Sequence, residues 1–342
     1  MKKVLVYIAF GTMGDILSAT PIVRKLYQVY ERKITVASRM GIVFKDNPYV
    51  DEHIEIHNTS NPTINNNFTD DLLSKYEDDY VIHKIGVSER NEDSTEDFFR
   101  HIRHMTLTNY MASQIGMHLM GSDHELDFFP TKVDIRNELN IPKKYVCLNI
   151  SRNGLLREWD IKNFQKLINL LNEIGIYVVC IGKSMDVNFH TWCNPHLYRD
   201  GVDTSKFNDV NIDIKYGINL FDKTDLDEVW DIIHNSKCFV TMDSGLLHLA
   251  GTTDTHIIQL GGDVNPIFRT PYRNASQFYK YSHIAGECTE FCASNLKYSV
   301  RNFGNARAML VDGVCYEFYD KSNFKCHSNV SKVFKKCKEI VK

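Results

Sequence analysis

The sequence predicts an α/β protein made of two consecutive doubly wound units. Short apolar runs alternate with stretches of helical hydrophobic period, once from residue 4 and again from residue 145. The chain has 342 residues, which is too long for one average domain. We therefore expect two Rossmann-like domains, at 1–140 and 141–282, followed by a small cysteine-rich extension at 283–342.

The first unit opens with a strand, a glycine turn and a helix. The continuous apolar run Val4–Ala9 is typical of a strand that is covered on both faces. Apolar residues then recur at helical spacing from Ala19 to Tyr30. Pro21 is expected in an early turn of that helix, where proline is tolerated. The next strand is expected at Ile34–Ala37, which completes a βαβ start and indicates a parallel sheet.

The second unit repeats this alternation. Strands are expected at 145–150, 176–181, 238–242 and 256–260, a short helix at 244–251 and a terminal helix at 329–341. Asp160 and Asp225 are expected to cap two further helices, and Gly175 to end the first of them. The buried face of that helix is predicted to comprise Phe164, Leu167, Ile168, Leu171 and Ile174. Two such units predict a ligand site in the cleft between them, at the carboxyl ends of the strands.

Composition argues against two classes of protein. The net charge is −3 and the pI is about 6.5, whereas a constitutive nucleic-acid binder usually shows a basic excess. The longest apolar run, Val4 to Phe10, is far shorter than the roughly 20 residues of a membrane-spanning helix. No small-x-small cleavage site follows that run, so we expect a cytoplasmic protein without a membrane span.

The glycine turn before the first helix is the first candidate site. Gly11 and Gly14 allow the backbone to turn sharply and to approach a ligand, and a helix N-terminus favours anions. The segment lacks the third glycine and the acidic partner of a dinucleotide fingerprint. Asp15 has two interpretations at this spacing, since it can cap the helix or act as a general base.

Two further motifs follow strands of the second unit. Ser244 and Gly245 open a short helix whose N–H groups can hold a phosphate, with His248 one turn along. The alternatives are that Asp243 caps this helix and that His248 is a core histidine. In the loop 151–159, Arg152 and Arg157 can neutralise a diphosphate. The alternative there is a solvated basic loop.

Together these motifs resemble glycosyltransferase family 9, the ADP-heptose:lipopolysaccharide heptosyltransferase family of GT-B architecture. Three segments carry the resemblance: Met13–Pro21, the loop 151–159 with Asn163 and Phe164, and Asp243–Gly251. The resemblance implies an inverting, metal-independent transfer of a heptose or hexose from a nucleotide diphosphate sugar. It implies Asp15 as the catalytic base. It also implies donor-binding roles for Gly14, Ser151, Arg152, Arg157, Gly182, Met242, Asp243, Ser244, Gly245 and His248.

Cysteines gather at the end of the chain. Four of them are close enough in sequence to form a closed tetrahedral site for structural zinc or iron: Cys288, Cys292, Cys315 and Cys326. Free structural cysteines and a disulfide are the alternatives. Cys337 and His327 are assigned to the terminal helix region rather than to the ligand set. The cluster resembles the cysteine-ligated iron site of the bacterial autotransporter heptosyltransferases, which modify proteins. No catalytic metal is expected.

The acceptor is left open by the sequence. A protein Ser or Thr, a glycan and a modified nucleobase all present a hydroxyl to the same base. Residues 98–120 have rough helical period, and basic residues around them indicate either an anionic acceptor or a solvated face: Arg90, Arg100, His101, Arg103 and His104. The alternative function is a non-catalytic module that binds nucleotide sugars or senses metal or redox state. A homo-oligomer is compatible with either function.

Overall fold

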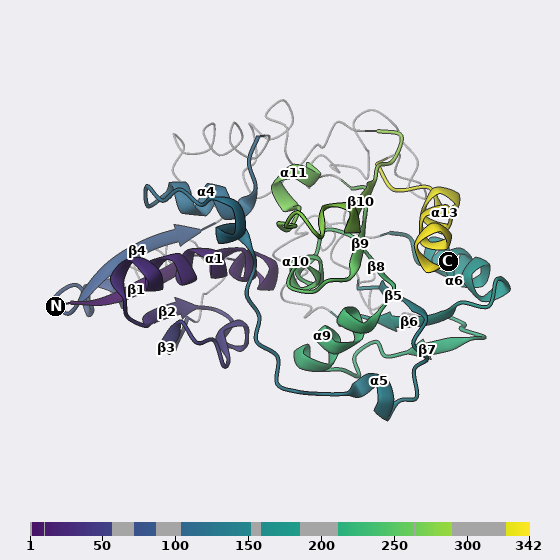
Figure 1. Ribbon diagram of the computed structural model, residues 1–342, viewed down its shortest axis with the longest axis horizontal. Helices are drawn as coiled ribbons and strands as arrows, with labels where there is room; N and C mark the ends of the chain where they lie inside the picture. Colours follow the sequence, from purple (N-terminus) through teal and green to yellow (C-terminus); the bar gives the residue numbers. More distant parts are fainter. Residues whose placement is uncertain are drawn as a thin grey trace, which may run out of the picture. The chain divides into compact units, whose positions relative to one another are not determined.

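The computed structural model describes residues 2–9, 11–56, 72–86, 104–151, 159–184, 211–262, 264–288 and 326–342 (Figure 1). The chain divides into two compact units by its contacts. The first unit comprises Met1–Thr131 and Ile267–Asn274, and the second comprises Lys132–Pro266 and Ala275–Lys342. The segment Ile267–Asn274 therefore packs with the first unit, although the sequence interpretation placed it inside the 141–282 domain.

The first unit contains a parallel four-stranded sheet. Its order is β3 (Val50–Glu55), β2 (Ile34–Ser38), β1 (Lys3–Ala9) and β4 (Tyr80–Gly86). Helix α1 (Met13–Tyr30) packs on β1 and β2, and α4 (Leu107–Ser113) packs against α1 and β4 (Figure 1). Two 3-10 turns, η1 (Gly41–Phe44) and η2 (Gly121–His124), also belong to this unit. The strands expected from residues 4 and 34 are confirmed.

Pro21 does not lie in an early turn of its helix, as the sequence interpretation had it. Helix α1 begins at Met13, so that Pro21 lies in the helix interior. Proline has no backbone N–H, which leaves the carbonyl of Leu17 without its usual partner four residues on. The hydroxyl of Thr20 donates to that carbonyl at 2.8 Å instead. This local compensation explains why the helix continues through Pro21.

The second unit contains a parallel six-stranded sheet. Its order is β10 (Tyr281–Ile284), β9 (His256–Leu260), β8 (Cys238–Thr241), β5 (Tyr145–Asn149), β6 (Tyr177–Ile181) and β7 (Gly217–Asn219). Strand β5 pairs with β6 on one side and with β8 on the other, so that the strand order reverses at β5. Open α/β sheets bind ligands outside the carboxyl ends of the strands at such a reversal. The strand order therefore predicts that a ligand binds to residues that follow β5, β6 and β8.

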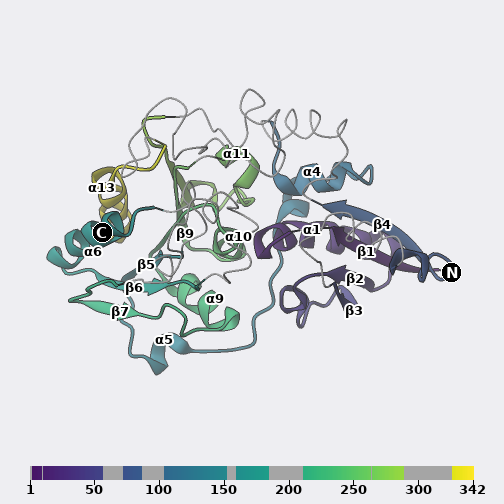
Figure 2. The same cartoon turned by 180° about the vertical axis from the view of Figure 1, so that it is seen from behind.

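Two helices that are far apart in sequence cover one face of this sheet. Helices α6 (Ile161–Glu173) and α13 (Val330–Val341) lie side by side (Figure 2) and share one apolar core with β5, β6 and β8. On the other face, the hydroxyl of Tyr145 donates to the carbonyl of Ile232 in α9 (Leu226–Asn235) at 2.5 Å. The remaining described helices of the unit are α5 (Ile135–Glu138), α10 (Gly245–Gly251) and the 3-10 turn η4 (Phe278–Lys280).

The predicted caps of α6 and α9 are confirmed. The carboxylate of Asp160 accepts the Lys162 N–H at 2.8 Å, and that of Asp225 accepts the Glu228 N–H at 2.9 Å. Ile174 was wrongly included in the buried face of α6, because it is the C-terminal cap and is 41% exposed. Along the described part of the chain, the longest and most apolar helices still fall short of what crossing a bilayer requires.

Candidate active site

Asp15 lies in the first turn of α1, directly after the carboxyl end of β1. Thr12 is the N-cap residue, and its backbone N–H donates to Asp15 Oδ2 at 2.8 Å. The Thr12 hydroxyl donates to the same oxygen at 3.2 Å. The capping role that the sequence offered for Asp15 is thus present in the structure, and it occupies one carboxylate oxygen.

The other carboxylate oxygen of Asp15 binds an arginine that no sequence motif singles out. Arg269, in the short helix α11 (Pro266–Arg269), donates from Nη1 to Asp15 Oδ1 at 2.8 Å. The two side chains are only 13% and 10% exposed. They are separated by 254 positions in the sequence. No motif precedes Arg269, so the pair was not visible in the sequence.

Glycine at position 11 allows the chain to pass close to Asp15. Gly11 has a φ of +142°, and a Cβ there would lie 2.8 Å from the Cβ of Asp15. Gly14 is buried in the first turn of α1, and its carbonyl accepts a hydrogen bond from the Ser18 hydroxyl at 2.9 Å. The turn, the cap and the arginine together hold the Asp15 carboxylate in one position.

A hydrogen-bonded network joins the carboxyl ends of β5 and β8 in the second unit. The buried amide of Asn149 donates to Thr241 Oγ1 and to Ser244 Oγ, both at 2.9 Å. Its oxygen accepts the Ser151 N–H at 3.1 Å. The hydroxyls of Thr241 and Ser244 are also 3.1 Å apart. This network fixes two residues that the sequence resemblance assigned to the donor, Ser151 and Ser244.

Gly182 extends the same edge to β6. It has a φ of +152°, and a Cβ there would lie 2.7 Å from Ser151 Oγ and 2.9 Å from the ring of Phe221. The next backbone N–H, of Lys183, donates to Ser151 Oγ at 3.2 Å. Ser151 and Gly182 therefore lie together at the reversal point of the sheet, where ligands of this fold class bind.

The start of α10 differs in one respect from the sequence interpretation. Ser244, not Asp243, is the N-cap residue, and Gly245 is the first helical residue. The Ser244 hydroxyl engages the Asn149 network instead of capping the helix. The other three predicted residues of this motif, Met242, Asp243 and His248, are buried.

Several predicted residues fall outside the part of the chain that the structure describes. They are Arg152 and Arg157 of the donor set, Cys292 and Cys315 of the metal set, and Arg90, Arg100, His101 and Arg103 of the basic region. Their assignments stay predictions. His104 is described and exposed.

The two described cysteines of the metal set lie on chain segments that converge. A Cβ at Gly261 would lie 2.6 Å from the carbonyl oxygen of Cys326 and 2.8 Å from the N–H of Gly286, two residues before Cys288. Within the described residues, no three side chains of the metal-binding types come together. Cys337 lies on α13, as predicted, and is buried in the same core as Cys238 of β8.

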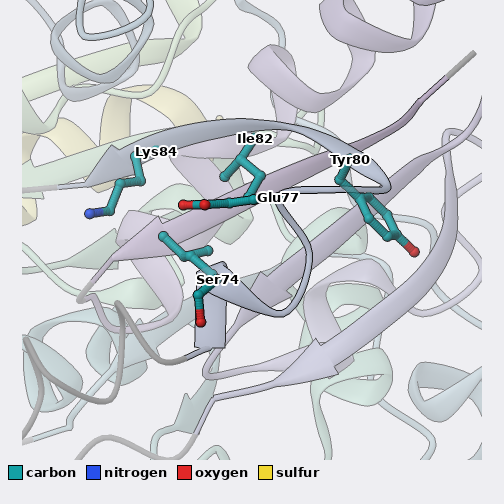
Figure 3. A pocket seen from close by; sticks show the side chains of 6 residues that line it. Ser74, Glu77, Tyr80, Ile82 and Lys84 are labelled. Carbon is teal, nitrogen blue, oxygen red and sulfur yellow. The ribbon is translucent and has the colours of Figure 1, made fainter.

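One pocket of the first unit lies away from all of these residues. It has a volume of about 550 Å³ and runs along β4 in the first unit (Figure 3). Its lining is Leu73, Ser74, Glu77, Tyr80, Ile82 and Lys84. None of the residues predicted for catalysis, donor binding or metal binding lines it. Its mixed lining gives no reason to move the candidate site there.

Known proteins support the family that the motifs resemble. Residues 103–297 match the model of glycosyltransferase family 9 (heptosyltransferase). A lipooligosaccharide heptosyltransferase 2 of Haemophilus influenzae is 39% identical over 57 residues. That match spans 17% of this chain and only 16% of the relative's length.

Solved structures share the fold over most of the chain. A family 9 glycosyltransferase of Veillonella parvula has a TM-score of 0.65 at 14% identity, over 100% of this chain and 98% of that one. TibC of enterotoxigenic Escherichia coli, described as a dodecameric iron-containing heptosyltransferase in complex with ADP-D-β-D-heptose, has a TM-score of 0.63 at 13% identity. That alignment covers 100% of this chain and 77% of TibC. The fold is thus of the predicted GT-B kind, with two parallel α/β sheets, and since the family model spans more than half of its length, the chain belongs to glycosyltransferase family 9.

Proposed function

We propose that this chain is an inverting, metal-independent glycosyltransferase with Asp15 as its general base. The observation that carries the proposal is the Asp15 carboxylate, which is buried at the carboxyl edge of the sheet and held from two sides by Thr12 and Arg269. A general base must be fixed within reach of the proton that it takes. Family membership supplies the reaction class.

The proposed reaction is a single displacement. Asp15 takes the proton of an acceptor hydroxyl while that oxygen attacks the anomeric carbon of the nucleotide sugar. The new oxygen–carbon bond forms as the bond from that carbon to the diphosphate breaks on the opposite side, so that the configuration inverts. The nucleoside diphosphate leaves with the electron pair of the broken bond. One carboxylate suffices because no covalent sugar–enzyme intermediate is formed.

The donor is proposed to bind at the carboxyl edge of the second unit's sheet. Ser151, Gly182, Ser244 and Gly245 lie at this edge, and the Asn149 network holds the two serines. Met242, Asp243 and His248 belong to the same proposed site, and Gly14 to the site around Asp15. Arg152 and Arg157 are proposed to neutralise the leaving diphosphate on sequence grounds. The named relatives favour an ADP-linked heptose as the first donor to try.

The first experiment measures donor binding and turnover together. Thermal shifts against ADP-, UDP-, GDP- and CDP-linked sugars identify the donor, since a ligand at a hundredfold its Kd stabilises by about 2.7 kcal/mol. Nucleotide release from that donor is then measured for the wild type and for Asp15→Asn, in the presence of each proposed class of acceptor, whose hydroxyl receives the sugar. Loss of a general base lowers kcat by about 10²- to 10⁴-fold. No shift and no turnover with any donor would instead support the non-catalytic module.

Asp123→Asn is the matched control. Asp123 also lies at the third position of its turn, where its carboxylate accepts the Met120 N–H at 3.3 Å and pairs with Lys25 at 2.9 Å. The control therefore removes a carboxylate charge that pairs with a basic side chain, as Asp15→Asn does, but outside the proposed site. It should keep the wild-type kcat. Equal losses in both variants would show that the effect of Asp15→Asn is one of folding.

A structural zinc or iron is proposed at Cys288, Cys292, Cys315 and Cys326. Four thiolates suit either metal and leave no open position, so the metal has no catalytic part. The convergence of the Cys288 and Cys326 segments at Gly261 supports the site, and TibC is described as iron-containing. Metal analysis of the purified protein tests it: about one equivalent is expected in the wild type and much less in Cys288→Ser.

The acceptor and the setting complete the proposal. A protein Ser or Thr, or a glycan, is the proposed acceptor, with a modified nucleobase as a third class to test. The cytoplasm is the proposed setting, on the composition described above. Homo-oligomerisation is proposed because TibC, which shares the fold, is described as dodecameric. Light scattering of the purified protein measures this directly.

A further inference from the structure

The segment Ile267–Asn274 is anchored along one side of the first unit. The ring of Phe268 is buried and meets Tyr110 of α4 edge-on, with 6.3 Å between the ring centroids. Tyr272 stacks on His124 with 5.3 Å between centroids and 25° between planes. Aromatic pairs of this kind stabilise a structure by more than the burial of their apolar area alone would. They fix the backbone on both sides of Arg269.

A polar contact strengthens this anchoring at the end of the segment. Asn274 Nδ2 donates to Glu125 Oε1 at 3.2 Å. His124, on which Tyr272 stacks, is itself held by Asn109 Oδ1 at 2.8 Å. Every one of these partners belongs to the first unit. These contacts fix the backbone of the segment to the first unit, and the fixed backbone holds the guanidinium of Arg269 beside Asp15.

We infer that Arg269 is a positioning residue that holds the Asp15 carboxylate in the orientation needed to take a proton. The inference rests on the proposed function, in which Asp15 is the base. Helix capping needs only Asp15 Oδ2, which Thr12 engages. The bond from Arg269 to Oδ1 sets the rotation of the carboxylate group, which the cap alone leaves adjustable.

The remaining acceptor capacity of Asp15 explains why this arrangement is compatible with catalysis. Each oxygen of an ionised carboxylate has two lone pairs. Arg269 uses one on Oδ1, so that the second stays available to a hydroxyl. An arginine stays protonated throughout and therefore does not compete for the proton. Arg269 acts through Asp15 and takes no proton itself.

The test compares Arg269→Ala and Arg269→Lys with the wild type in nucleotide release from ADP-D-β-D-heptose, or from the nucleotide sugar that the thermal shifts select. Misplacement of a catalytic group by about 1 Å costs on the order of 10²-fold, so kcat of Arg269→Ala should fall about 10- to 100-fold. The KM for the donor should change little, because the donor is held by the second unit. Arg269→Lys should recover part of kcat, since it restores the charge but not the planar fork.

Chemical rescue separates positioning from a merely structural role. Low, non-denaturing guanidinium should restore part of kcat in Arg269→Ala and none in Asp15→Asn. Lys25→Ala is the control, because Lys25 lies in α1, as Asp15 does, and pairs with Asp123 at 2.9 Å. Its kcat should equal that of the wild type with and without guanidinium. Arg269→Lys serves as the folded comparison should Arg269→Ala lose its structure.

The outcomes distinguish the two proposals. A wild type that turns over no nucleotide sugar, or an Asp15→Asn variant with full kcat, overturns the proposed function and this inference with it. An inactive Asp15→Asn beside an Arg269→Ala with wild-type kcat overturns this inference alone. So does a loss of kcat in Arg269→Ala that guanidinium and Arg269→Lys both fail to restore, since that loss would be structural.

Discussion

The contact between Thr20 and Leu17 should carry a measurable share of the first unit's stability. Thr20 is fully buried. Its hydroxyl donates to the Leu17 carbonyl at 2.8 Å and accepts the Asp127 N–H at 2.9 Å. Pro21 makes the first bond necessary, because the residue that would normally donate to Leu17 has no N–H. Thr20→Val keeps the shape of the side chain and removes both bonds.

The loss of unfolding free energy in Thr20→Val depends on the polar groups that stay buried without a partner. Removing one partner of a buried hydrogen bond costs about 1–3 kcal/mol when the other is left unsatisfied. Two such groups, the Leu17 carbonyl and the Asp127 N–H, give an expected loss of about 2–6 kcal/mol. Part of this should return with Pro21→Ala, which supplies a backbone N–H to Leu17. That substitution should stabilise the Thr20→Val variant by about 1 kcal/mol more than it stabilises the wild type.

Urea unfolding of the four proteins measures this double-mutant cycle. Thr35→Val is the control: the Thr35 hydroxyl donates at 3.2 Å to Asp51, which is exposed, and it has no proline to compensate. The control should lose less than about 1 kcal/mol, the net value of an ordinary hydrogen bond. Strict additivity of Thr20→Val and Pro21→Ala would refute the reasoning, because it would show that Leu17 does not connect them.

Two further predictions concern the donor edge and pH. Gly182→Ala should weaken donor affinity by about tenfold or more, because its Cβ would lie 2.7 Å from Ser151 Oγ. Gly175→Ala, at a φ of +74° with no atom within 4 Å of its Cβ, should show only the backbone strain of about 1–3 kcal/mol and leave titrated donor affinity intact. Burial lowers the pKa of His53, His83 and His283, so the unfolded chain binds more protons just below its histidine pKa of about 6.5. Stability should therefore be full above that pH and fall as the pH drops below it; unfolding midpoints that stay flat from pH 7.5 to 5.5 would contradict this.

Elements whose signals are local were predictable from the sequence. Asp160 and Asp225 cap their helices because a short acidic side chain can reach an N–H two or three residues on, wherever the helix later packs. The fully buried strands read as continuous apolar runs, which no other environment favours as strongly. The edge strand β3, Val50–Glu55, was missed because it carries charged residues and only half-buried apolar ones. Its strand character depends on pairing with β2, which the sequence does not display.

Features that depend on contacts between residues far apart in the chain could not be predicted from the sequence. Ile174 fits the helical period of α6, yet the helix ends one residue earlier and leaves it exposed. Arg269 reaches Asp15 across 254 positions, through a segment that the domain order assigned elsewhere. Periodicity and motif spacing report on neighbours within a few turns. They contain nothing about a partner that only the folded chain brings near.

The two carboxylate oxygens of Asp15 make different contacts, so the capping role and the role of general base can be tested separately. An asparagine at this position keeps an oxygen for the Thr12 N–H and so preserves the cap. The loss of stability in Asp15→Asn then falls on the Arg269 contact, where a mostly buried cation loses its carboxylate at a cost of about 3–5 kcal/mol. Combining it with Arg269→Gln should recover much of that stability, since both charges are then gone, while turnover stays at the level of Asp15→Asn. A capping residue would show stability and turnover recovering together, whereas a base separates them.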